Sequence, residues 1–295
     1  MFGQLWPASG GVTVCGALLV TAMLLAGSAA MPASAADESA ASTIPDFEIG
    51  NGVAWREIGD EFLPPPSGPG PVTEDPLHPF RSNGAVRQGL APTYHIGDVT
   101  NPILQPWAAE QMRKDNEAVL AGGVAFRPNE RCIPGGVPEF VLIARIAPFY
   151  FLQTAREVTI FNENGPEIRR VFMNVPHSAN VKPSWYGESV GHYEGGDTLV
   201  VDTVGISANS YVDNFRTPHT DKLHVIERFR ISPDRKSLED LVTVDDPGAF
   251  TTQWSGIQRF NLEKRQMREA VCAENNVNFF GKGALPMPVA GKPDF

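Results

Sequence analysis

The stretch WYGESVGHYEGGDTLVVDTV, residues 185–204, decides the fold that we predict for this chain. Its two halves, 185–193 and 198–204, are rich in valine, threonine and aromatic side chains, which favour β-strands. A Gly-Gly-Asp turn at 195–197 separates them. Strands joined by so short a turn pair antiparallel, because parallel strands need a long crossover connection.

The same pattern of short strands and turns continues on both sides of this hairpin. Turn residues stand at 164–166 (Asn-Gly-Pro), 233–235 (Pro-Asp-Arg) and 263–265 (Glu-Lys-Arg). We therefore predict a mainly β protein, an antiparallel up-and-down barrel or barrel-like sandwich, with one α-helix and a Pro-rich N-terminal extension. The predicted strands are Phe140–Ile146, Phe149–Thr154, Glu157–Phe161, Glu167–Met173, Trp185–Tyr193, Thr198–Val204, Lys222–Ile231, Leu238–Asp245, Thr252–Leu262 and Met267–Cys272.

The chain divides into three parts by composition. We predict a signal peptide at 1–36, a Pro/Gly-rich extended segment at 37–100, and a single β-rich domain at 101–295 with a helix near 106–121. Proline removes backbone donors and glycine adds backbone freedom, so the second part is expected to be extended and non-regular. The helix opens on a proline and is followed by two glycines, which suit its first position and its end.

The signal peptide is predicted from charge and from a cleavage pattern. The first 35 residues carry no charged side chain, and Val12–Ala30 is almost wholly apolar or small. Pro32 and the small-x-small sequence at 33–35 then favour cleavage. The alternative is a retained membrane anchor, because the apolar run is nearly long enough to span a bilayer. We expect an exported protein, located in the periplasm or secreted.

The formal net charge of −10 belongs to the part that follows the signal peptide. An acidic surface argues against nucleic acid, whose phosphates need a basic surface, and against a membrane partner after signal cleavage. No phosphate-binding glycine loop joins a strand to a helix, so we expect no nucleotide and no other cofactor. The expected partner is a small-molecule ligand or substrate.

Two cysteines, Cys132 and Cys272, remain after the signal peptide. An oxidising compartment favours their pairing, so we predict a disulfide. Closing so long a loop contributes about 4 to 5 kcal/mol at most. Two free buried thiols are the alternative.

Residues 187–191, GESVG, match the G-x-S-x-G motif of serine hydrolases, with Ser189 at the nucleophile position. That motif requires a strand-to-helix turn, which exposes the serine. A turn and a second strand follow here instead of a helix, so the context disfavours a serine hydrolase. Ser189 remains a candidate ligand-binding residue.

Four of the six histidines, His177, His192, His219 and His224, lie close together in the sequence. His219 and His224 with Glu227 could form a metal site, but His224 and Glu227 are three apart on a strand and so point to opposite faces. A site of His177, His219 and His224 lacks tight ligand spacing, so hydrogen-bonding or structural histidines are favoured and we assign no metal.

Two carboxylates interrupt apolar faces of the predicted strands. Asp202 shares a face with Val200, and Glu227 shares one with Phe229. A carboxylate on a buried face has a partner or a raised pKa. A structural ion pair, with Arg170 or Arg228 as possible partners, is the simpler interpretation for either carboxylate. The alternative is a general acid or base inside the barrel that orients a histidine.

Three large aromatic residues lie beside this region: Trp185, Tyr186 and Trp254. Core packing explains them, and stacking against an aromatic or steroid-like ligand is the alternative.

Four motifs together resemble a known family. They are W-x-G-x-S-x-G at 185–191, EGGDTLVVDT at 194–203, LHVxERF at 223–229 and RCIPGGVP at 131–138. Within residues 101–276 the chain resembles a widespread family of exported bacterial β-rich proteins of unassigned function. It departs from that pattern at Gly195-Gly196, where we expect one glycine, and at Tyr193, where tryptophan is usual.

Two functions from different classes follow. The first is a cofactor-independent enzyme that acts on a small, partly apolar molecule by acid–base chemistry, as a lyase, isomerase or hydrolase. The second is a non-catalytic periplasmic binding protein for a hydrophobic ligand inside the barrel; a structural envelope protein is a weaker third. The candidate catalytic residues are His177, His219, His224, Asp202 and Glu227, and the candidate ligand-binding residues are Trp185, Tyr186, Ser189, Arg228 and Trp254.

Overall fold

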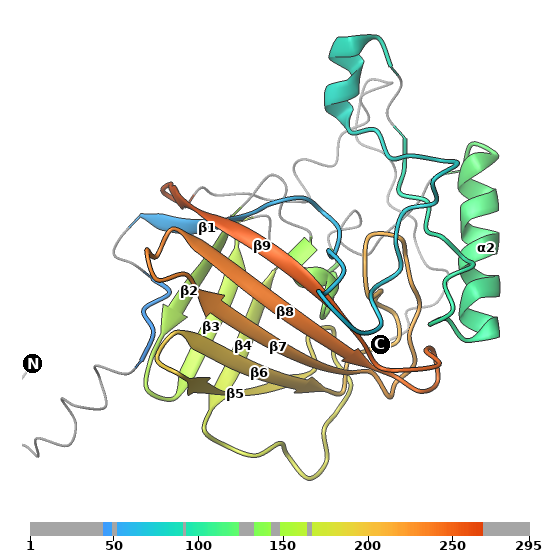
Figure 1. Ribbon diagram of the computed structural model, residues 1–295. Coiled ribbons are helices and arrows are strands. Elements are labelled where there is room, and N and C mark those ends of the chain that lie inside the picture. The colour runs from blue at the N-terminus through green and yellow to red at the C-terminus, as the bar shows by residue number, and fades with distance from the viewer. Residues whose placement is uncertain are drawn as a thin grey trace, which may run out of the picture.

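The computed structural model describes residues 44–48, 52–90, 93–123, 133–142, 148–163 and 167–267. Within these residues, nine strands close into a barrel in which each strand pairs with the next and β9 pairs with β1 (Figure 1). The prediction of a mainly β barrel with one α-helix is confirmed for this part of the chain. The strands are β1 (Val53–Glu57), β2 (Phe149–Gln153), β3 (Glu157–Asn162), β4 (Ile168–Met173), β5 (Glu188–Glu194), β6 (Thr198–Val204), β7 (His224–Ile231), β8 (Ser237–Asp245) and β9 (Trp254–Lys264).

One strand pair departs from the antiparallel pattern. β4 and β5 run parallel, with Val171 opposite Ser189, whereas the other neighbouring pairs among the described strands are antiparallel. Residues 174–187 return the chain as a loop to the end of the barrel where β4 began. This crossover brings His177 next to β5 and β6.

β1 comes from the Pro/Gly-rich segment, where we expected non-regular chain. It pairs with β9 from Val53 opposite Lys264 to Glu57 opposite Phe260. Trp55 anchors it, because this side chain is buried and its Nε1 donates to a backbone carbonyl at 2.8 Å. Closure of the barrel therefore needs residues that precede position 101.

The α-helix α2 (Pro106–Leu120) matches the prediction and buries Ala108, Met112 and Asn116. In the described part of the chain, no helix is long and apolar enough to cross a membrane. Two short 3₁₀ helices, η1 (Asn83–Gln88) and η3 (Glu139–Leu142), complete the helical elements of the described residues.

The predicted strand Phe140–Ile146 is wrong in its described part. All four residues of η3 are buried, and the Phe140 ring lies 4.9 Å from the ring of Phe149 and 5.7 Å from that of Tyr186. The apolar side chains of η3 thus pack against barrel residues instead of pairing in a ladder.

Several predictions fall outside the described residues. They are the signal peptide at 1–36, both cysteines Cys132 and Cys272, and the strand Met267–Cys272 apart from Met267.

Side chains fill the barrel interior. On β6, Leu199, Val201 and Thr203 point inward and are fully buried. Asp202 points outward on the same strand and is half-buried. The alternation of a strand thus places Asp202 on the outer face, where the candidate site lies.

Candidate functional site

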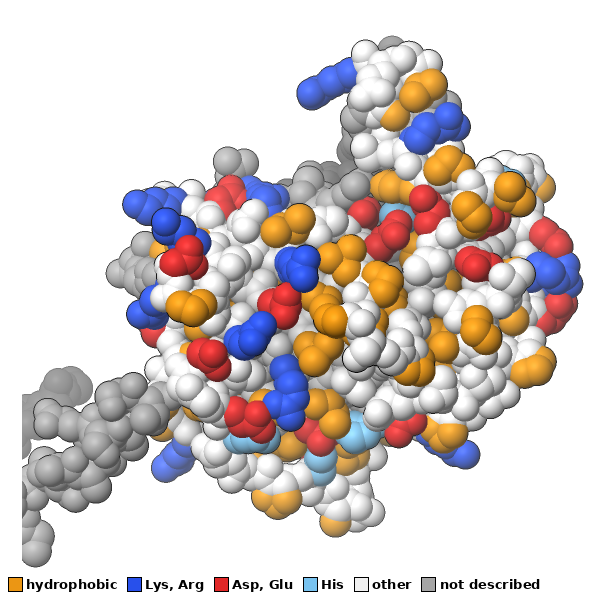
Figure 2. All heavy atoms as spheres, in the orientation of Figure 1, with side chains coloured by type: hydrophobic (Ala, Val, Ile, Leu, Met, Phe, Trp, Pro, Cys, Tyr) orange, Lys and Arg blue, Asp and Glu red, His pale blue; other side chains and the backbone are white. Residues whose placement is uncertain are grey.

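Asp202 joins two histidines on the outer face of the barrel. Its Oδ1 lies 3.0 Å from Nε2 of His177 and 2.8 Å from Nε2 of His224. His177 comes from the β4–β5 loop, and His224 is the first residue of β7. Figure 2 shows histidine and acidic side chains gathered along the lower edge of the barrel. Three of the predicted catalytic residues therefore meet at one place.

Glu188, the first residue of β5, extends the group. Its Oε1 lies 3.1 Å from Nδ1 of His177, while the backbone N–H and hydroxyl of Ser178 donate to its two oxygens at 2.7 and 2.5 Å. The hydrogen bonds from Ser178 hold the pKa of Glu188 below its usual range. The result is a relay of four side chains, which we call the outer-face relay: Glu188, His177, Asp202 and His224.

The contacts of the outer-face relay determine where protons sit. Asp202 accepts from Nε2–H of both histidines, so His224 is held in the tautomer that leaves Nδ1 unprotonated. Nδ1 of His224 makes no hydrogen bond within the described residues, and the side chain is 37% exposed. A positioned imidazole nitrogen with an open lone pair is the arrangement of a general base.

Apolar side chains flank the relay. Val190 and Ile226 stand directly opposite Asp202 on the two neighbouring strands, and both are half-buried. One pleat away, the row His192, Val200 and Arg228 crosses the same three strands. Successive outward positions on a strand are about 7 Å apart.

Glu194 contacts two residues of that second row, His192 and Arg228. Glu194 accepts from Arg228 Nη1 at 2.5 Å and lies 2.9 Å from Nε2 of His192. These contacts lower the pKa of Glu194, first through His192 and then through Arg228. Arg228, a predicted ligand-binding residue, is therefore exposed and close to the relay rather than inside the barrel.

His219 does not join the relay. It is buried, its Nε2 lies 2.9 Å from Ser210 Oγ and its Nδ1 lies 2.8 Å from the carbonyl of Thr220. Ser210 Oγ also lies 2.9 Å from the carbonyl of Ser207. Three contacts need three protons, whereas a neutral histidine and a serine carry two. Burial lowers the pKa of His219, so one contact stays unsatisfied in the neutral form.

Glu227 lies in the barrel interior and forms a structural ion pair. Its two oxygens accept from Nη1 and Nη2 of Arg169 at 2.9 and 2.5 Å, and both side chains are fully buried. The partner is thus Arg169 rather than Arg170 or Arg228, because Arg169 on β4 points inward. Arg169 also contacts Ser189 and Thr203, so Ser189 is enclosed in the same buried network.

Asp240 on β8 lies near this pair and is fully buried. Burial first, and the charge of Glu227 second, raise its pKa well above the usual range. The charge of Arg169 and then the Arg228 backbone amide lower that pKa, yet neither oxygen makes a hydrogen bond of ordinary geometry within the described residues. Burial and the nearby carboxylate therefore both favour the protonated form of Asp240.

A second perturbed carboxyl lies near η3. Glu167 is 1% exposed and accepts from the hydroxyl of Tyr186 and, at 3.4 Å, from the backbone N–H of Gly135. Burial raises the pKa of Glu167 to about 7. Burial and the nearby carboxyl also raise the pKa of Tyr186, so this predicted ligand-binding residue is held as a hydrogen-bond donor.

The other two predicted ligand-binding aromatics differ in accessibility. Trp254 is buried, with its ring 6.2 Å from the ring of Phe62 and 5.6 Å from that of Phe250. Trp185 is half-buried in the β4–β5 loop. Core packing accounts for Trp254.

Sequence reasoning did not single out Glu188, Arg169, Glu167 or Asp240. In the sequence, Glu188 occupies only the variable position after the first glycine of the G-x-S-x-G motif, which assigns it no role. Alternation along β4 and β8 could have placed Arg169 and Asp240 inward. The structural partners of Glu167 lie in separate segments, so no local pattern signals its burial.

The fold and site define a class: a closed β-barrel with a histidine–carboxylate relay on its outer face. No known protein family matches this chain, and no curated protein sequence is similar to it. The resemblance to exported bacterial β-rich proteins stays a prediction.

Proposed function

We propose that this protein is an exported, cofactor-independent enzyme that moves protons on a small, partly apolar molecule at the outer-face relay. The observation that carries the proposal is the contact of one carboxylate oxygen, Asp202 Oδ1, with Nε2 of both His177 and His224. The reaction class is a lyase, an isomerase or a hydrolase, since each needs a positioned acid or base.

His224 is the proton-transferring group in this proposal. Asp202 orients its ring and stabilises the imidazolium that forms when Nδ1 takes a proton. His177 contacts a carboxylate at each ring nitrogen, so its ring is held in place next to Asp202. His177 and Asp202 are therefore positioning residues, and His224 is the catalytic residue.

The surroundings favour a substrate with an apolar part and a polar or anionic end. Val190 and Ile226 offer an apolar floor beside Asp202. Arg228, one pleat away, uses Nη1 for Glu194 and retains further N–H groups to bind an anionic end. Export to the periplasm or the exterior, with a Cys132–Cys272 disulfide, is part of the same proposal and rests on the sequence.

The experiment compares three purified variants, His224→Gln, Asp202→Asn and, as the matched control, His192→Gln. His192 lies on the same face and also contacts a carboxylate, but outside the relay. Two probes are used: hydrolysis of p-nitrophenyl esters and α-proton exchange of small ketones in D₂O, followed by NMR. We expect the first two variants to lose about 10²- to 10⁴-fold in rate and the control to keep it.

Circular dichroism establishes that each variant is folded. Equal rates in all variants would refute the proposed role of the outer-face relay. In addition, His224→Gln is expected to abolish the histidine-dependent limb of the pH–rate profile, which a purely structural role would leave in place.

A second candidate function is binding of a hydrophobic ligand without catalysis. Its support is an external groove of 490 Å³ lined by Leu77, Tyr94, Ile96 and Leu120 among others, within the size range of small-molecule sites. The filled barrel interior favours this groove over the interior as the ligand site. A ligand that co-purifies with the protein and is not converted over time would favour this function over catalysis.

A further inference from the structure

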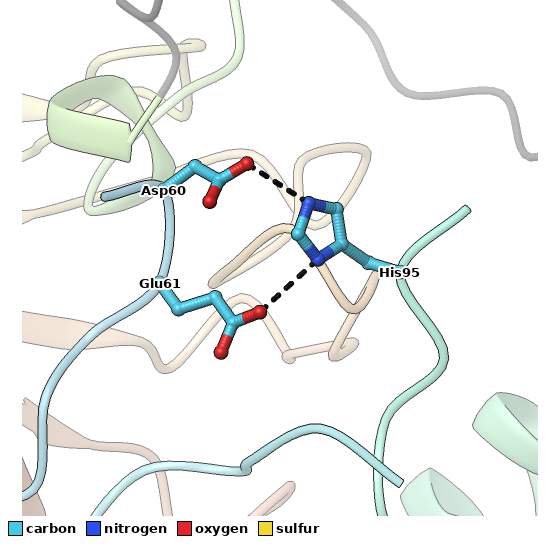
Figure 3. A group of neighbouring side chains, drawn as sticks. All are labelled: Asp60, Glu61 and His95. Atoms are coloured by element: carbon cyan, nitrogen blue, oxygen red, sulfur yellow. Dashed lines mark hydrogen bonds and ion pairs between the residues drawn. The ribbon is translucent and has the colours of Figure 1, made fainter. Parts of the chain in front are cut away.

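Two segments that are distant in the sequence bring together a histidine and two carboxylates. Asp60 and Glu61 follow β1, and His95 precedes α2. Figure 3 shows both carboxylates directed toward the imidazole ring of His95. Each of the three residues offers one atom that can bind a metal ion, and these three atoms lie within 4.8 Å of one another in the described part of the chain.

The backbone holds this group in place. Two residues to either side of the pair, the N–H groups of Ile58 and Leu63 donate to backbone carbonyls of β9 at 2.7 and 2.9 Å. The side chain of Asn214 donates to the backbone carbonyl of Asp60 at 2.5 Å. On the other side, the residue after His95, Ile96, accepts from the N–H of Asp75 at 2.8 Å. The donor atoms are therefore positioned by chain segments with fixed partners.

The group is largely withdrawn from water. The side chains of His95 and Asp60 are 9% and 12% exposed, and that of Glu61 is 32% exposed. Two carboxylates this close in a partly buried place repel each other, and a cation between them offsets that repulsion.

The ring of His95 contacts a different carboxylate at each nitrogen. Nε2 lies 3.1 Å from Asp60 Oδ2, and Nδ1 lies 3.3 Å from Glu61 Oε1. The second contact is misaligned, so the buried Nδ1 makes no hydrogen bond of ordinary geometry. Because Cε1 lies between the two nitrogens, that corner of the ring faces the gap between the carboxylates.

If the His95 ring turns by 180° about χ2, Nε2 takes the position that Cε1 holds in the structure. The ring plane is unchanged by this rotation, so the stacking on Phe80, with centroids 3.7 Å apart, is preserved. In the rotated ring Nε2 of His95 points into the gap between Asp60 and Glu61.

We propose that Asp60, Glu61 and His95 form a binding site for one divalent first-row transition-metal cation, separate from the outer-face relay. One imidazole nitrogen and two carboxylate oxygens suit zinc, manganese or iron rather than calcium or magnesium, which prefer oxygen ligands alone. Ligand distances of about 2.0 to 2.2 Å place neighbouring donors about 3.0 to 3.4 Å apart. Small movements of Glu61, the most exposed of the three, bring the donors to that spacing. Three protein ligands leave coordination positions for water.

The test uses the protein expressed without residues 1–36, treated with chelator and then titrated with Zn²⁺ or Mn²⁺ in a calorimeter. We expect binding of one ion per chain and a rise of Tm with metal concentration. Asp60→Asn and His95→Gln should each weaken binding at least about tenfold and abolish the rise in Tm.

His78→Gln is the matched control. His78 lies in the same N-terminal segment and contacts Asp75 at 2.8 Å, but it is exposed and outside the group. His224→Gln is the second control, because it tests the outer-face relay as the metal site. Both controls should keep wild-type affinity.

Three results would overturn the proposal. The first is that the wild-type protein binds no metal, in which case the group is an imidazolium held between two carboxylates. The second is that Asp60→Asn and His95→Gln bind metal as the wild type does. The third is that only His224→Gln loses binding. If the Asp60 and His95 variants do not fold, Glu61→Gln replaces them, and visible absorption of bound Co²⁺ reports the ligand set. A Co²⁺ spectrum that is unchanged in Glu61→Gln contradicts the site.

Discussion

Glu167→Gln should change how the stability of the fold depends on pH. Glu167 is 1% exposed, and burial raises its pKa from 4.5 to about 7. The folded state therefore binds a proton that the unfolded state has already released at neutral pH. Because the folded pKa is the higher one, the stability from this group is fully present below pH 4.5. It is lost as the pH rises through about 7.

The shift fixes the magnitude. A difference of 2.5 units between the two values in the folded and unfolded states corresponds to about 3 kcal/mol at 1.36 kcal/mol per unit. Glutamine has nearly the same shape, accepts the hydrogen bond from Tyr186 and carries no charge. We compare the free energy of unfolding of Glu167→Gln with that of the wild type at each pH. Between pH 5 and pH 8.5 this difference should change by about 2 to 3 kcal/mol in favour of the variant.

The assay is urea unfolding followed by tryptophan fluorescence at several values between pH 5 and 8.5. Other titrating groups are common to both proteins and cancel in the difference. Glu157→Gln is the control, because Glu157 is paired with Arg170 at the surface and its pKa is lowered instead. Parallel pH profiles for the wild type and Glu167→Gln would show that Glu167 is ionised in the folded state, and the reasoning would fail.

Two further changes test the packing. Arg169→Met should lower the free energy of unfolding in urea by about 3 to 5 kcal/mol, because it leaves the fully buried Glu227 without its partner. The double change Arg169→Met with Glu227→Leu should recover most of that loss. A loss below about 1 kcal/mol in the single variant would mean that water reaches the pair. Gly187→Ala should lower the free energy of unfolding by about 1 to 3 kcal/mol, and with it Tm. Gly187 has a φ of 62°, and an added Cβ would lie 2.4 Å from the carbonyl oxygen of Val204. An unchanged Tm would contradict this backbone conformation.

The sequence predicted the architecture from local signals. Strand Thr198–Val204 was predicted at its observed bounds, and α2 within one residue. These elements are set by turn residues, alternation and a proline start, which act between near neighbours. The segment Phe140–Ile146 looked like a strand by composition alone, and its described part instead buries apolar side chains as η3.

The candidate site was only partly visible in the sequence. Alternation placed Asp202 on the same face as Val200, and we predicted that this face is the barrel interior. That prediction is wrong for Asp202, because Leu199, Val201 and Thr203 fill the interior and Asp202 lies on the outer face. The meeting of Asp202 with His177 depends on the parallel β4–β5 pairing, which a run of hairpin signals does not predict. His219 is close to His224 in the sequence and yet bonds to Ser210 within its own loop.

The sequence by itself determined the strands from β2 to β9 approximately, the single helix, the acidic charge and a short set of histidines and carboxylates, since all of these follow from composition and short-range pattern. The tertiary structure alone decided that Glu227 pairs with Arg169 inside, that Asp202 faces out to two histidines, and that Asp60 and Glu61 reach His95. The physical reason is that barrel closure and the β4–β5 crossover bring together residues whose separation along the chain carries no local signal.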